Sequence, residues 1–110
     1  GPVIPPSACG CPAGMAQWEA LEAAAHSGPR VRQRSRNVLD WPALGRIKAP
    51  TLCIAGGADL YMPPALTRLY ASHIPGSRVV NLPECGHSAY WEQPDAFNKA
   101  VIGFLNSVRG

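Results

Sequence analysis

Hydrophobic and polar residues change their spacing several times along the chain, and each spacing predicts a different element. Between residues 47 and 57, IKAPTLCIAGG holds a continuous apolar run that two glycines end. A run without alternation predicts a strand buried on both faces, as in a parallel sheet covered by helices. Residues 78–82 (RVVNL) predict a second strand.

Helical spacing surrounds these strands. Residues 15–27 are rich in Ala, Glu and Leu, and Gly28-Pro29 ends the helix that they predict. Pro63-Pro64 opens a helix that runs to about Ser72. Pro94 opens the last helix, which is expected to reach Val108. Its apolar stripe recurs at helical spacing and consists of Phe97, Ala100, Val101, Phe104, Leu105 and Val108.

The first half of the chain is less regular. Residues 1–14 contain four prolines and three glycines, so they predict a loop. Residues 30–44 are expected to form a second short helix and a turn at Asp40-Trp41-Pro42, although the alternating arginines also fit an extended segment.

The order strand, helix, strand, helix predicts an α/β fold. A βαβ unit pairs its strands in parallel through a right-handed crossover. Two strands alone do not form a stable sheet, so the pattern demands more strands than this sequence predicts.

Composition excludes some classes of function. The chain has 110 residues, suited to one domain, and its apolar share of 46% provides for a core. No apolar run approaches the ~20 residues of a membrane span, and the N-terminus has no signal-peptide pattern. We therefore expect a cytoplasmic protein without a membrane partner.

The net charge of +3 is mild, and four arginines, Arg30, Arg32, Arg34 and Arg36, lie together. A basic cluster can bind nucleic acid, but no aromatic residue interleaves with it, so a solvated face is expected and nucleic acid is not.

Four cysteines occur. Cys53 and Cys85 are expected to be small buried residues. Cys9 and Cys11 with a histidine could form a metal site, but a second spaced pair is lacking. We expect a reduced chain with no metal and no cofactor.

Two residues with chemistry follow the two predicted strands. Asp59 lies three residues past Gly56, and His87 follows Gly86 shortly after the second strand. Both fall at the carboxyl edge of a parallel sheet, where open α/β folds bind ligands, about 5 Å apart across one strand spacing. A histidine used as a general base needs a carboxylate to hold its tautomer and to stabilise its charge.

The stretch from about residue 44 to residue 108 resembles the last two strands and helices of α/β-hydrolases. In that family a G-x-x-D-x-x-x-P loop supplies the acid and a later G-H turn supplies the histidine. Gly56, Asp59 and Pro63 match the first motif, and Gly86 and His87 match the second. Glu92, Pro94 and a helix ending in Phe104-Leu105 match the usual close of the fold.

The resemblance implies a domain division. Residues 1–43 would form a loop and a helical lid-like segment, and residues 44–110 the C-terminal βαβα part of the hydrolase core. It also implies a Ser–His–Asp mechanism on an ester or a related carbonyl substrate, with Asp59 and His87 as catalytic residues.

The family's nucleophile motif is absent. No serine of the chain has the flanking glycines of G-x-S-x-G, and Gly10-Cys11-Pro12-Ala13-Gly14 carries proline at the nucleophile position. The nucleophile is therefore expected from an upstream part, and the chain is expected to pair with such a hydrolase half or with a copy of itself. The alternative is a catalytically inactive fragment that acts as a binding module.

A purely structural interpretation is also open for the candidate residues. Asp59 could be only a polar turn residue, and His87 only a loop histidine. His26 and His73 are expected at the surface of helices, Glu84 in solvent, and Asp40 is an alternative acid. Tyr61, Met62, Ser88, Tyr90 and Trp91 flank the two loops; Tyr61, Met62, Ser88 and Trp91 are expected to line a substrate pocket, although core packing would also fit the aromatic residues and Met62.

Overall fold

The computed structural model describes residues 12–25 and 28–109. These residues form, in chain order, α1 (Pro12–Ala25), α2 (Trp41–Gly45), β1 (Leu52–Gly56), α3 (Pro64–Ser72), β2 (Arg78–Leu82), α4 (Ala89–Glu92) and α5 (Pro94–Ser107).

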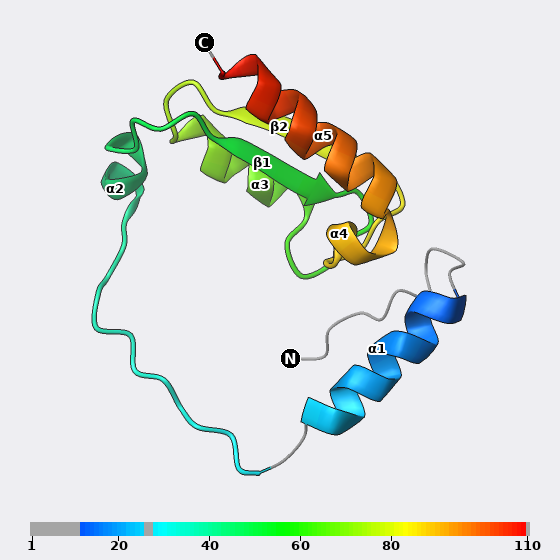
Figure 1. Ribbon diagram of the computed structural model, residues 1–110. Helices are drawn as coiled ribbons and strands as arrows, with labels where there is room; N and C mark the ends of the chain where they lie inside the picture. Colours follow the sequence, from blue (N-terminus) through cyan, green and yellow to red (C-terminus); the bar gives the residue numbers. More distant parts are fainter. Residues whose placement is uncertain (1–11, 26–27, 110) are drawn as a thin grey trace.

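The two strands form a parallel sheet in which Leu52 lies opposite Arg78 and Gly56 opposite Leu82. Helix α3 connects the strands, and α3 and α5 lie on opposite faces of the sheet (Figure 1). The predicted α/β class is confirmed. A small core forms where β2 ends, from Leu82, Cys85 and Ala89, with Ile54 and Phe97 among the side chains packed against it.

The bounds of α3 and β2 are those predicted, and α5 ends one residue early. Strand β1 is shorter than the predicted range of 47–57. Pairing starts only where the Arg78 N–H donates to Thr51 O at 3.0 Å, and the preceding Pro50 has no N–H to offer.

The short helix expected within residues 30–44 forms only at the end of that range, as α2, and the arginine-rich part agrees with the extended alternative. Residues 29–40 have no regular secondary structure, and all of them are exposed. Alternating arginines offer no apolar stripe to bury, and a short helix without such a stripe is not stable. The expected turn at residues 40–42 is instead the start of α2, where Asp40 Oδ1 accepts a hydrogen bond from the Ala43 N–H at 3.1 Å.

The sheet is too narrow to bury the apolar side chains of β1 and of the α5 stripe fully. Within residues 12–25 and 28–109, β1 pairs with β2 only, and Leu52, Cys53 and Ile54 are half-buried rather than buried on both faces as expected. Leu105 and Val108, at the end of the α5 stripe, are 55% and 38% exposed. Two strands cannot cover the whole stripe.

None of the helices in the described part of the chain is long and apolar enough to cross a membrane.

Candidate active site

The loop that carries Asp59 begins where β1 ends, at Gly57. The Gly57 N–H donates to Leu82 O at 2.7 Å and the Ala58 N–H donates to Cys85 O at 2.8 Å, so the loops after β1 and β2 run side by side. The Asp59 N–H donates to Gly56 O at 3.1 Å and closes a tight turn. The turn folds Asp59 inward, and the residue is only 6% exposed.

The Asp59 carboxylate is oriented by the chain that follows it. Its Oδ1 accepts hydrogen bonds from the Tyr61 N–H at 2.8 Å and from the Met62 N–H at 3.0 Å. A side chain that bonds the backbone two and three residues ahead forms a local turn, which needs no distant partner. The second oxygen, Oδ2, therefore points in a fixed direction.

The turn that carries His87, residues 83–87, follows the end of β2 and is called the histidine turn here. Glu84 adopts φ 60°, a left-handed conformation that reverses the chain after Pro83. Cys85 is fully buried, and the chain passes Gly86 close to the end of β1. His87 then projects outward with a side chain 41% exposed.

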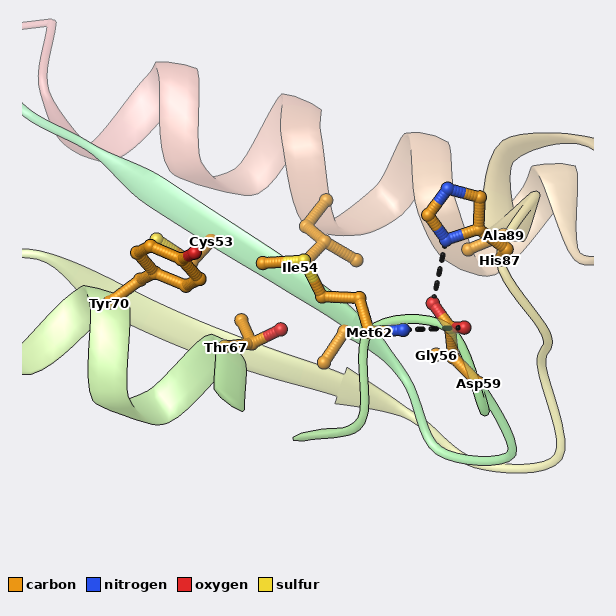
Figure 2. Close-up of a pocket in the computed structure, with 10 residues that line it drawn as sticks. Cys53, Ile54, Gly56, Asp59, Met62, Thr67, Tyr70, His87 and Ala89 are labelled. Atoms are coloured by element: carbon orange, nitrogen blue, oxygen red, sulfur yellow. Dashed lines mark hydrogen bonds and ion pairs between the residues drawn. The ribbon is translucent and has the colours of Figure 1, made fainter. Parts of the chain in front are cut away.

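The structure brings the two predicted residues together. His87 Nδ1 lies 2.9 Å from Asp59 Oδ2 (Figure 2). The expected hydrogen-bond distance between Asp59 and His87 is confirmed. The Tyr61 ring packs edge-on against the imidazole, with 5.0 Å between the ring centroids.

The electrostatics fix the tautomer of His87. Burial tends to raise the pKa of Asp59, but the hydrogen bonds from Met62, His87 and Tyr61 and the charge of His87 outweigh it and hold that pKa below its usual range. An ionised carboxylate only accepts hydrogen bonds, so Nδ1 of His87 must donate. In neutral His87 the other nitrogen, Nε2, is then unprotonated, and it lies on the side of the ring away from Asp59 (Figure 2).

A cavity of about 250 Å³ extends from this pair along β1. Asp59 and His87 lie at one end, and Thr67 and Tyr70 of α3 lie at the other (Figure 2). Met62 also lines it.

The other expected pocket residues have different surroundings. Tyr61 lies over His87 and is 71% exposed, and Ser88 is buried, with its carbonyl accepting the Trp91 and Glu92 N–H groups at 2.9 Å. Trp91 contacts α1: its Nε1–H donates to Gly14 O at 3.2 Å, and its ring meets Trp18 edge-on with centroids 6.0 Å apart. Met62 alone of the four lines the cavity beside the acid–histidine pair.

The alternative candidates occupy structural positions. Asp40 caps α2, so its carboxylate is engaged in the helix start. His73, expected at the surface, is half-buried at the end of α3 because its ring stacks on Trp41 with 4.5 Å between centroids. Glu84 is exposed, as expected.

Cys85 is buried as expected, whereas Cys53 is half-buried, and burial raises the pKa of its thiol.

Metal ligands do not gather in the described residues: no group of three or more His, Cys, Asp or Glu side chains could hold an ion there. The hypothetical site at Cys9 and Cys11 and the prediction for His26 lie outside the described residues.

Sequence reasoning missed α4 and the position of one of its residues. Glu92 is 6% exposed and lies against the histidine turn. Its place before Pro94, where a helix must restart, was the available signal. The four residues of α4 are too few to show a helical period.

Comparison with known proteins identifies the family to which the chain belongs. The family model described as "Alpha/beta hydrolase family" matches residues 3–100. The chain belongs to the α/β-hydrolase family.

Individual relatives agree with this assignment. BpoC of Mycobacterium tuberculosis, whose name describes a non-heme bromoperoxidase, is 38% identical over 68 residues, which cover 62% of this chain and 26% of BpoC. Its crystal structure superposes with a TM-score of 0.68 at 27% identity, covering 87% of this chain and 38% of that one. A 2-hydroxy-6-oxononadienedioate/2-hydroxy-6-oxononatrienedioate hydrolase of Klebsiella pneumoniae is 46% identical over 65 residues, covering 58% of this chain and 22% of the enzyme.

An enol-lactonase of Burkholderia xenovorans is structurally similar too, with a TM-score of 0.57 and 41% identity over 60% of this chain and 25% of that one. The chain thus spans about a quarter of the length of the curated relatives that it matches.

Proposed function

We propose that this chain supplies the acid and the histidine of a serine hydrolase that acts on an ester or a related carbonyl substrate. The observation that carries the proposal is the 2.9 Å contact between His87 Nδ1 and Asp59 Oδ2 at the carboxyl edge of the parallel sheet. Family membership supports it, because α/β-hydrolases use an acid and a histidine at these two loops.

The chemistry divides between the two side chains. A serine hydroxyl attacks the carbonyl carbon of the substrate while His87 Nε2 accepts the hydroxyl proton. The imidazolium is stabilised by the ionised Asp59, which holds the ring through Nδ1. His87 then returns the proton to the leaving group, and the cycle repeats with water as the attacking group.

The nucleophile comes from polypeptide outside these 110 residues, since none of their serines has the G-x-S-x-G setting. The partner is therefore an upstream hydrolase segment that adds strands beside β1, or a second copy of this chain. The half-exposed α5 stripe favours such an association, as does the pairing of β1 with a single strand among residues 12–25 and 28–109.

Two relatives suggest the kind of bond that is cleaved. One is named a 2-hydroxy-6-oxononadienedioate/2-hydroxy-6-oxononatrienedioate hydrolase and one an enol-lactonase. Esters, lactones, thioesters and activated C–C bonds next to a carbonyl form the proposed substrate class. The proposal includes no cofactor, no metal and no nucleic acid.

The test uses the chain assembled with a co-expressed α/β-hydrolase segment that carries G-x-S-x-G. Hydrolysis of p-nitrophenyl butyrate and labelling of the serine by a fluorophosphonate probe are measured for the wild type, His87→Ala and Asp59→Asn. We expect His87→Ala to remove most turnover and Asp59→Asn to lower it by about 10⁴-fold through loss of the correct tautomer.

The matched control is His73→Gln, because His73 stacks on Trp41 and contacts neither catalytic side chain. It should leave turnover unchanged. Normal hydrolysis by the His87→Ala assembly would overturn the assignment. A well-folded wild-type assembly without turnover or labelling would favour the alternative, a catalytically inactive binding module.

A further inference from the structure

Glu92 is a buried charged residue that the acid–histidine mechanism leaves without a role. It ends α4 and is 6% exposed. Its N–H donates to Ser88 O at 2.9 Å, so the chain from residue 88 to residue 92 closes on itself just after His87. Burial of a carboxylate is costly unless polar contacts compensate for the lost water. A carboxylate at this place therefore calls for a reason.

The carboxylate lies directly against the residue before His87. A β-carbon placed on Gly86 would come 3.1 Å from Glu92 Oε2 and 3.3 Å from Oε1. Both oxygens thus face the α-carbon of Gly86, and a larger residue there would push them away.

The same turn also lies against the end of β1, where the approach is closer still. A β-carbon placed on Gly56 would come 2.2 Å from Gly86 O and 2.6 Å from Cys85 O. The Gly86 backbone is therefore held between the end of β1 and the Glu92 carboxylate.

The position of the Gly86 backbone determines where the His87 side chain starts. The His87 side chain is 41% exposed, and its contacts described above are the Asp59 carboxylate and the Tyr61 ring, itself 71% exposed. The backbone of the turn sets how far the ring lies from the Asp59 carboxylate. A shift of the turn by about 1 Å would lengthen the bond from Nδ1 to Asp59 beyond hydrogen-bond distance.

We propose that Glu92 is a positioning residue: its buried carboxylate fixes the Gly86–His87 backbone so that His87 Nδ1 stays bonded to Asp59 Oδ2. The consequence for turnover rests on the proposed function; the positioning itself does not.

The first test observes the bond rather than the reaction. The 110-residue chain, in the assembly that it forms in solution, is labelled with ¹⁵N-histidine, and the Nδ1–H resonance and tautomer of His87 are recorded by NMR. Glu92→Ala should lose at least half of the His87 Nδ1–H intensity. Glu92→Gln keeps the shape and one acceptor oxygen, and it should retain more of that intensity than Glu92→Ala.

Two controls separate positioning from general stability. Glu19→Gln removes the same charge from an exposed position of α1 and should leave His87 unchanged. His73, stacked on Trp41, reports on the rest of the fold. Unchanged His87 signals in Glu92→Ala would overturn the proposal. Equal losses at His73 and His87 in both Glu92 variants would also overturn it, because Glu92 would then serve the fold as a whole.

The second test measures kcat and KM in the assembled hydrolase. Glu92→Ala should lower kcat by about 10- to 100-fold with little change in KM, as misplacement of a reacting group does. Wild-type turnover together with unperturbed His87 in Glu92→Ala would reject the role of Glu92 and keep the proposed function. Loss of the His87 bond in an assembly that never hydrolyses esters would reject the function and keep the positioning.

Discussion

Gly56 leaves no room for a β-carbon beside the histidine turn, which allows a sharp prediction about the acid–histidine pair. Gly56→Ala would place its methyl group 2.2 Å from Gly86 O and 2.6 Å from Cys85 O, both of them backbone atoms. Ordinary van der Waals contact between a carbon and an oxygen atom is longer than these distances. The backbone of the histidine turn must therefore move away from Gly56 by about 1 Å. A bond of 2.9 Å from His87 to Asp59 that is lengthened by that amount is no longer a hydrogen bond.

The energetic cost follows from the same contact. Overpacking a filled site costs about 1–3 kcal/mol, and each kcal/mol shifts the melting temperature of a domain of this size by about 4–8 °C. Gly103→Ala is the matched control, because nothing lies within 4 Å of its β-carbon position in the interior of α5. Alanine should stabilise that helix by about 0.5–1 kcal/mol.

Thermal unfolding by circular dichroism is compared at equal chain concentration, and the His87 Nδ1–H resonance is recorded below the melting temperature. We expect Gly56→Ala to melt earlier and to lose the resonance, and Gly103→Ala to melt slightly later and to keep it. A Gly56→Ala chain that melts with the wild type and retains the His87 resonance would refute the reasoning.

Three further predictions concern pH, the first helix and association. The lowered pKa of Asp59 stabilises the fold above an unfolded value of about 3.9, and this contribution is lost as pH falls through the folded pKa. Urea unfolding should therefore show a deficit for Asp59→Asn at pH 6 that shrinks towards pH 2; a pH-independent deficit would contradict it. Trp91→Phe removes the bond to Gly14 O, worth about 0.5–1.5 kcal/mol, so hydrogen exchange of α1 amides should rise about 2- to 12-fold while α5 stays unchanged. Light scattering should show that the chain does not persist as a well-ordered monomer, and ester assays should find it inactive alone. A sharp monomer peak with a cooperative melt would contradict the first claim, and turnover by that monomer the second.

The sequence alone determined the elements that carry their own local signals. Prolines at the starts of α3 and α5 placed these helices closely, and the apolar runs located both strands, although β1 starts later than expected. Because parallel strands end at the same edge, Asp59 and His87 could be paired before any contact was known, and the Asp59 turn depends only on its next three residues.

Tertiary structure decided what depends on contacts between distant residues. Of the two alternatives left open for Trp91, pocket lining and packing, the structure shows packing against α1, because a partner for its indole N–H lies 77 positions away at Gly14. His73 is covered by Trp41, and the arginine-rich segment stays extended because no surface receives it. The return of Glu92 onto Gly86 depends on the short helix α4, which has no period to detect. Such contacts are set by the direction of side chains in the assembled fold, and spacing along the chain does not encode that direction.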